Sequence, residues 1–169
     1  MAKKHFQIGQ QACEKLAERF GTPLLVLSLD EIKKNYKVLK KYLPRIKVHY
    51  AIKANPHPEI LRVMADMGSC FDVASDGEIR TLHDLGIEGG RMIYANPVKT
   101  GAGLAACRSC HVSKMTFDSA SEIDKIKTQC PEATLLLRLR IDNSSAHVDL
   151  NKKFGAAREN ALALMLQAK

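Results

Sequence analysis

The stretch Val48-His49-Tyr50-Ala51-Ile52-Lys53-Ala54-Asn55-Pro56 predicts a short apolar strand that ends beside a lysine. Asn55 and Pro56 end the strand, because proline cannot donate a hydrogen bond to a β-ladder and favours a turn. Lys53 should therefore lie at the carboxyl end of a buried strand. Burial disfavours a charged amine, and a neutral amine is the form that attacks a carbonyl to give a Schiff base. Position alone favours a simpler interpretation, in which Lys53 is the first solvated residue after the strand.

The same unit, an apolar strand followed by a turn and an amphipathic helix, recurs along the chain. The predicted strands cover residues 24–29, 46–52, 70–73, 92–95, 114–117 and 134–141. The predicted helices cover residues 31–42, 58–67, 76–86, 101–110, 120–129 and 156–169, and the polar segment 142–155 predicts a loop. Asp30, Ser75 and Ser119 are the expected N-caps, and Gly68 fits a helix C-terminus.

Alternation of strands and helices indicates parallel strands joined by right-handed crossovers. A doubly wound open sheet and a (β/α)8 barrel both satisfy this pattern, and the barrel needs ~250 residues. No Gly-x-Gly-x-x-Gly follows any predicted strand, which argues against a dinucleotide-binding sheet. We therefore expect the α/β class, as a TIM barrel truncated to roughly the first five or six β/α units.

The composition is that of a water-soluble globular protein. The chain has 169 residues, enough for one domain with a sizeable core, so a single domain over 1–169 is expected. No apolar run reaches the ~20 residues of a membrane helix, and no apolar segment follows the basic N-terminus as a secretory signal would require. These features predict a cytoplasmic location and no membrane partner.

The net charge of +8 is of the kind that nucleic-acid-binding proteins carry. The densest basic group consists of Lys33, Lys34, Lys37, Lys40 and Lys41. Their spacing fits the outer face of one helix, with Ile32, Tyr36, Leu39 and Leu43 on the inner face. No aromatic residues interleave with these lysines as a base-stacking surface would require, so we expect no nucleic-acid partner.

The five cysteines form no obvious disulfide framework. Cys107-Arg108-Ser109-Cys110-His111 matches the Cys-x-x-Cys-His pattern of haem attachment, but that chemistry needs an exported protein and no export signal is visible. A zinc site needs further ligands, and no second cysteine pair has the required spacing. We therefore expect reduced structural thiols and no metal.

Reacting groups gather at the carboxyl ends of the strands in parallel α/β proteins. The residues at these ends are Lys53, Asp72, Asn96, Asp118 and Arg138. Asp72, or Glu78 in the next helical turn, could hold a lysine or an imine in its protonated form. Arg138 lies within an apolar run and needs a partner, so a structural ion pair and a role in the site are equally consistent with its position.

Motifs in a fixed order extend this pattern from about residue 22 to the chain end. They are Tyr50-Ala51-Ile52-Lys53-Ala54-Asn55, Phe71-Asp72-Val73-Ala74-Ser75 with Glu78, Tyr94-Ala95-Asn96-Pro97-Val98-Lys99, Thr116-Phe117-Asp118-Ser119 with Glu122, Leu137-Arg138, and Lys152-Lys153-Phe154-Gly155. Together they resemble the fold-type III pyridoxal-phosphate decarboxylases, which are built on a barrel of alanine-racemase type. The third motif and the stretch 149–155 most resemble the ornithine and lysine branch, especially its bacterial lysine/ornithine enzymes.

The resemblance implies that Lys53 holds pyridoxal 5'-phosphate and that Ala51, Asp72, Glu78 and Arg138 surround the cofactor and the lysine. It implies a carbon–carbon lyase that converts ornithine, lysine or both to a diamine in polyamine biosynthesis, with diaminopimelate and arginine as alternative substrates. The full-length family members are homodimers. Lys153 matches a lysine at their subunit boundary, so it is given no catalytic role.

Other family features have no counterpart in the sequence: the ring-stacking histidine, the glycine-rich phosphate loop, the acid paired with the pyridine nitrogen, and the C-terminal β domain. We therefore expect the N-terminal part of the pyridoxal-binding barrel, incomplete on its own. The alternative from another class is a truncated or non-catalytic homologue that acts through a partner chain. The presence of Lys53 argues against a decayed site.

Overall fold

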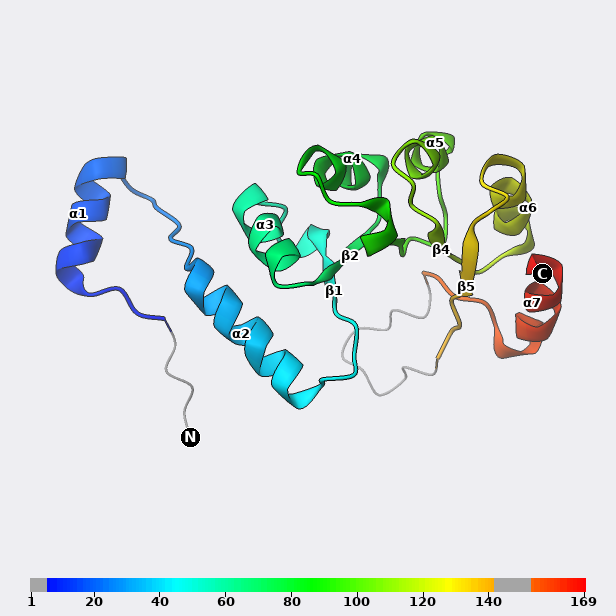
Figure 1. Ribbon diagram of the computed structural model, residues 1–169, viewed down its shortest axis with the longest axis horizontal. Coiled ribbons are helices and arrows are strands. Elements are labelled where there is room, and N and C mark those ends of the chain that lie inside the picture. Colours follow the sequence, from blue (N-terminus) through cyan, green and yellow to red (C-terminus); the bar gives the residue numbers. More distant parts are fainter. Residues whose placement is uncertain (1–5, 142–152) are drawn as a thin grey trace. The chain divides into compact units, whose positions relative to one another are not determined.

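The computed structural model describes residues 6–141 and 153–169, and the chain forms two compact units, 1–46 and 47–169. The first unit contains the helices α1 (Gln10–Phe20) and α2 (Leu29–Tyr42), at the blue end of the chain in Figure 1. Lys152 and nearly all of the predicted loop 142–155 lie outside the described residues. The single domain expected over 1–169 stays a prediction.

The predicted strand 24–29 is wrong. Residues 24–28 are irregular, and Leu25 is 92% exposed, because an extended apolar segment without a neighbouring strand gains no ladder hydrogen bonds. The helix that follows begins two residues earlier than expected. Ser28, rather than Asp30, is its N-cap, and the Ser28 hydroxyl accepts a hydrogen bond from the Glu31 N–H at 3.3 Å.

Helix α1 was not among the predicted elements, and its N-terminus explains why. Its N-cap is Gly9, which makes no side-chain capping hydrogen bond, and none of its residues is buried. No capping residue therefore marks the start of this helix in the sequence.

The second unit repeats the strand–helix pattern that the sequence predicts. Its strands are β1 (His49–Ala51), β2 (Cys70–Val73), β3 (Met92–Tyr94), β4 (Lys114–Phe117) and β5 (Thr134–Leu137). Its helices are α3 (Pro58–Asp66), α4 (Asp76–Asp84), α5 (Gly101–Ser109), α6 (Ala120–Gln129) and α7 (Ala161–Ala168), with 3₁₀ turns η1 (Ile52–Ala54), η2 (Gly89–Arg91) and η3 (Arg158–Asn160). The first and last strands are shorter than predicted, and the last helix begins later.

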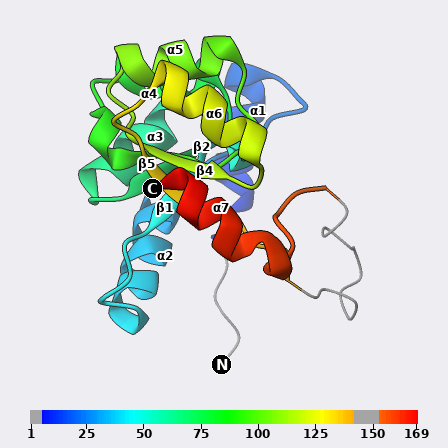
Figure 2. The same cartoon turned by 90° about the vertical axis from the view of Figure 1, so that its right-hand side faces the viewer.

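The sheet decides between the two candidate architectures. Its five strands are all parallel and lie in the order β1-β2-β3-β4-β5, so each crossover moves to the next position in one direction. Helices α3 to α6 cover the same face of the sheet (Figures 1 and 2). A doubly wound sheet needs a reversal of strand order and helices on both faces, whereas a (β/α)8 barrel needs neither. The described strands therefore have barrel topology.

Alternation along the strands separates a core face from a second face. Phe71, Val73, Met115 and Phe117 are buried, whereas Asp72 between the first two is half-buried. Because successive strand residues point to opposite faces, the buried set packs under the helices and Asp72 points the other way. Among the described residues, no helix is both long and apolar enough to cross a membrane.

Candidate functional site

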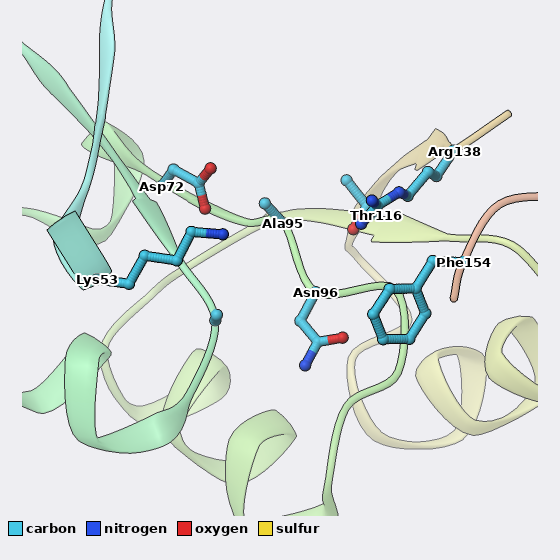
Figure 3. A pocket seen from close by; sticks show the side chains of 8 residues that line it. Lys53, Asp72, Ala95, Asn96, Thr116, Arg138 and Phe154 are labelled. Atoms are coloured by element: carbon cyan, nitrogen blue, oxygen red, sulfur yellow. The ribbon is translucent and has the colours of Figure 1, made fainter. Parts of the chain in front are cut away.

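A cavity of about 510 Å³ opens at the carboxyl ends of the strands in the second unit (Figure 3). This volume falls in the range of small-molecule sites. The cavity is lined by Lys53, Asp72, Ala74, Ala95, Asn96, Thr116, Arg138 and Phe154. Four of the five strand-end residues singled out in the sequence thus meet in one place, and Asp118 is the exception.

Lys53 lies in η1, directly after β1. The preceding Ile52 is only 1% exposed and anchors the turn in the core, while the Tyr50 hydroxyl donates to the Asn55 carbonyl at 3.1 Å across the same turn. Lys53 itself is exposed, as the interpretation from position alone expects for the first solvated residue after the strand. Its amine points into the cavity in Figure 3, where a small molecule can reach it.

Asp72 comes from β2 and lies on the same side of the cavity as Lys53 (Figure 3). Burial raises the pKa of its carboxyl above the ordinary value, and the charges of Lys53, His49 and Arg138 oppose that shift. Ala51 is in register with Asp72 on the neighbouring strand, so both side chains project from the same face of the sheet. Ala51 is not among the lining residues.

Arg138 lies on the opposite side of the cavity from Lys53 (Figure 3). The prediction that it sits inside a strand is wrong, because β5 ends at Leu137 and Arg138 is exposed beyond it. Its N–H still donates to the Phe117 carbonyl at 2.8 Å, which fixes its backbone to β4. Its guanidinium carbon lies 5.2 Å from the centre of the Phe154 ring, a cation–π contact. No ion pair of Arg138 is found among the described residues.

Glu78 lies outside the cavity lining and caps α4. One oxygen of its carboxylate accepts the Ala74 N–H at 2.6 Å, and the Ser75 hydroxyl accepts the Glu78 N–H at 3.2 Å. This reciprocal pair is a variant of the capping box, reaching one residue further back. Because Ala74 lines the cavity, Glu78 holds part of the cavity wall through the backbone.

Asp118 is not among the lining residues and contacts the chain just after the undescribed segment. Its carboxylate accepts the Gly155 N–H at 2.8 Å. Gly155 has φ of +106°, and an added Cβ would lie 2.8 Å from the Arg140 nitrogen, so this position requires glycine. The bond holds Gly155, and hence the adjacent Phe154, near the carboxyl ends of the strands.

The sequence did not single out Ala74, Ala95, Thr116 or Phe154 as site residues. The two alanines carry no chemical signal. Thr116 could have been found from strand alternation, because it faces away from the buried Met115 and Phe117. Phe154 lies within a recognised motif, but its contact with Arg138 joins segments that are separate in the sequence.

The described residues contain no cluster of side chains suited to a metal ion. Cys107 and Cys110 of the haem-like pattern are 1% and 5% exposed, and burial raises the pKa of the Cys107 thiol to about 12. Both cysteines are therefore protected core residues, without access for a haem.

The lining residues fit a cofactor that carries an aldehyde and an anionic group. An accessible lysine amine can form a Schiff base with an aldehyde. The guanidinium of Arg138, on the other side, is a donor that binds oxyanions well. The half-buried carboxylate of Asp72 lies in the electrostatic reach of both cations. Pyridoxal phosphate has these two features, so its chemistry suits this donor set.

Comparison with curated proteins shows relatives over nearly the whole chain. The lysine/ornithine decarboxylase of Selenomonas ruminantium is 50% identical over 165 residues, which cover 98% of this chain and 42% of that protein. The ornithine decarboxylase of Saccharomyces cerevisiae is 36% identical, over 94% of this chain and 34% of the relative. Antizyme inhibitor 2 of Xenopus laevis is also 36% identical, over 83% of this chain and 30% of its own. The chain thus spans less than half the length of these relatives.

Solved structures give the same result. The crystal structure of lysine decarboxylase from Selenomonas ruminantium superposes with a TM-score of 0.92 at 50% identity, over 98% of this chain and 43% of that one. A structure of the lysine decarboxylase SrLDC in complex with PLP and cadaverine has a TM-score of 0.89 at 47% identity, over 98% of this chain and 41% of that one. Both likenesses extend across the strands that form the cavity.

The family model described as the pyridoxal-binding domain of the pyridoxal-dependent decarboxylases matches residues 29–169. This range includes every strand of the sheet and every residue that lines the cavity. On the strength of this match and of the 50% identical relative, the chain belongs to the pyridoxal-dependent decarboxylase family.

Proposed function

We propose that the intact protein decarboxylates a basic amino acid, ornithine or lysine, to the corresponding diamine with pyridoxal phosphate held at Lys53. The observation that carries the proposal is the cavity at the strand ends, where the exposed Lys53 amine faces Asp72 and Arg138. The 50% identity to a lysine/ornithine decarboxylase supports the substrate class.

Each residue has a distinct proposed task. Lys53 would bind the cofactor covalently through its amine, and Asp72 would hold a proton on that nitrogen by its negative charge. Arg138 would bind an oxyanion of the cofactor or the substrate. Ala51 would leave room for the ring, and Glu78 would act through the Ala74 backbone. Pyridoxal phosphate, when bound, supplies an electron sink for the bond that breaks at the substrate α-carbon.

The wider assignments follow from the same family membership. We propose that the intact protein forms a homodimer, works in polyamine biosynthesis and is cytoplasmic, without nucleic-acid or membrane partners. The pyridoxal-binding part would then be the domain that this chain contributes, over 1–169.

Lysine mapping tests the cofactor site. The intact protein is mixed with pyridoxal phosphate, reduced with borohydride and digested, and the labelled peptides are identified by mass spectrometry. We expect the label on Lys53, its loss in Lys53→Ala, and its retention in the control Lys47→Ala, which removes a nearby exposed lysine. A label spread over many lysines without preference for Lys53 would contradict the site.

A non-catalytic role is the second candidate, because antizyme inhibitor 2 is among the relatives. A measurement of carbon dioxide release distinguishes the catalytic role from the non-catalytic one. The substrates tested are ornithine, lysine, arginine and diaminopimelate. Catalysis predicts release from ornithine or lysine that Lys53→Ala abolishes. Labelling at Lys53 without release from any of the four would favour the non-catalytic role.

A further inference from the structure

A second motif lysine, Lys99, is buried behind the cavity wall. Its side chain is 0% exposed, and that of its partner Glu122 is 3% exposed. Lys99 lies between β3 and α5 and is not among the residues that line the cavity. A buried charge is costly unless it is fully paired, so its contacts indicate what it does.

The Lys99 ammonium has three protons and three close acceptors. It donates to the Thr116 carbonyl at 2.6 Å, to the Glu122 carboxylate at 3.0 Å and to the Asn96 carbonyl at 3.1 Å. The other Glu122 oxygen contacts the Lys125 ammonium at 2.6 Å. Burial lowers the pKa of Lys99, and the hydrogen bond and negative charge of Glu122 oppose that shift, favouring the charged form.

Two of these acceptors belong to residues that line the cavity, namely Asn96 and Thr116. The ladder between β3 and β4 pairs Ile93 with Lys114 and Tyr94 with Met115, and it extends no further. Lys99 therefore joins the two chain segments just beyond the end of the ladder, where strand hydrogen bonds no longer hold them together.

We propose that Lys99 is a positioning residue for the cofactor cavity, which it shapes by holding the Asn96 and Thr116 backbones from behind. This inference rests on the proposed pyridoxal-phosphate site. Lys99 has no access to the cavity and takes no part in covalent chemistry. A hydrophobic residue of similar volume could fill the space, but it would leave the buried Glu122 carboxylate without this partner and could not bind the two carbonyls.

Arg91 provides a matched control at the opposite end of β3. It lies in η2, just before the strand, and its guanidinium donates to the Ala65 carbonyl at 2.7 Å and to the Ser69 carbonyl at 2.5 Å. Like Lys99, it is a cation that binds two backbone carbonyls between segments. Unlike Lys99, it binds no residue of the cavity lining.

The experiment compares Lys99→Met and Arg91→Met in the intact protein. Urea unfolding measures stability, and titration with pyridoxal phosphate, followed by visible absorbance and circular dichroism, measures cofactor affinity and orientation. We expect both variants to unfold at lower urea concentration. Only Lys99→Met should bind the cofactor at least about tenfold more weakly, with altered dichroism of the bound cofactor, because a displaced wall misplaces the ligand.

Wild-type affinity and dichroism in a folded Lys99→Met would overturn the proposal, as would an equal loss of affinity in Arg91→Met. If Lys99→Met does not fold, the variant Glu122→Gln tests the proposal by the same measurements. It keeps the packing and removes the negative charge that pairs with the Lys99 ammonium. If the wild-type protein shows no labelling at Lys53, the proposed cofactor site itself fails, a result distinct from failure of the Lys99 role.

Discussion

The cap of α4 offers a quantitative test of how Glu78 acts. Its carboxylate accepts the Ala74 N–H at 2.6 Å, a charge-assisted bond to a half-buried group worth about 1.5–3 kcal/mol. We expect Glu78→Ala to lower the free energy of unfolding by about 2 kcal/mol. Glu78→Gln should cost about 1 kcal/mol or less, because the amide oxygen still accepts the bond. Ser75→Ala should cost about 1 kcal/mol by removing the hydroxyl that caps the Glu78 N–H.

Urea denaturation followed by far-ultraviolet circular dichroism gives these free energies. Glu59→Gln is the matched control, since Glu59 lies in the first turn of α3 and makes an ion pair with Arg62 in which both side chains are 53% exposed. Exposed pairs contribute about 0–1 kcal/mol, so its loss should be small. Equal destabilisation by Glu78→Gln and Glu78→Ala would refute the hydrogen-bond argument. Loss of cofactor affinity in Glu78→Gln without loss of stability would instead favour direct contact with the cofactor.

Two further predictions concern buried titratable groups. Tyr94 is 2% exposed and burial raises its pKa from 10.0 to about 12, so its contribution to stability is present below pH 10 and is lost as the pH rises toward 12. Wild type should lose about 2–3 kcal/mol relative to Tyr94→Phe between pH 9 and 12 in urea titrations, and parallel pH profiles would contradict this. For the thiols, iodoacetamide at neutral pH should modify Cys13 alone in the native protein, because the other cysteines are buried; mass spectrometry that shows several adducts before urea is added would count against the fold.

The sequence predicted the bounds of the central strands well, because residues next to these strands in the chain determine where they begin and end. Strand β2 begins just after Gly68, whose φ is +82°, and ends before the Ser75 cap, so turn chemistry bounds it on both sides. The range 114–117 was likewise confirmed as β4. In β4 the buried residues alternate with partly exposed ones, whereas in β2 Asp72 alone is partly exposed.

The errors arose where a neighbouring strand, and not local composition, decides the outcome. The run 24–28 is as apolar as the true strands, but it has no ladder partner among the described residues and stays irregular. The leucine-rich run around Arg138 continues past the last pair of the β4–β5 ladder, Phe117 with Leu137. Register with β4 therefore ends β5 one residue before Arg138 and leaves its side chain exposed at the cavity.

Strand position alone marks Lys53 and Lys99 in the same way, and it was the resemblance to a known family that assigned the cofactor to Lys53. Both lysines follow a strand within a motif. Lys53 comes two residues after β1, in a turn that directs its amine into the cavity. Lys99 comes five residues after β3, just before the Thr100 cap of α5, where its amine meets three oxygen acceptors and no solvent. A reactive lysine needs an amine that a ligand can reach, and a structural lysine needs hydrogen-bond acceptors for its ammonium. The folded chain shows that Lys53 has the first and Lys99 the second.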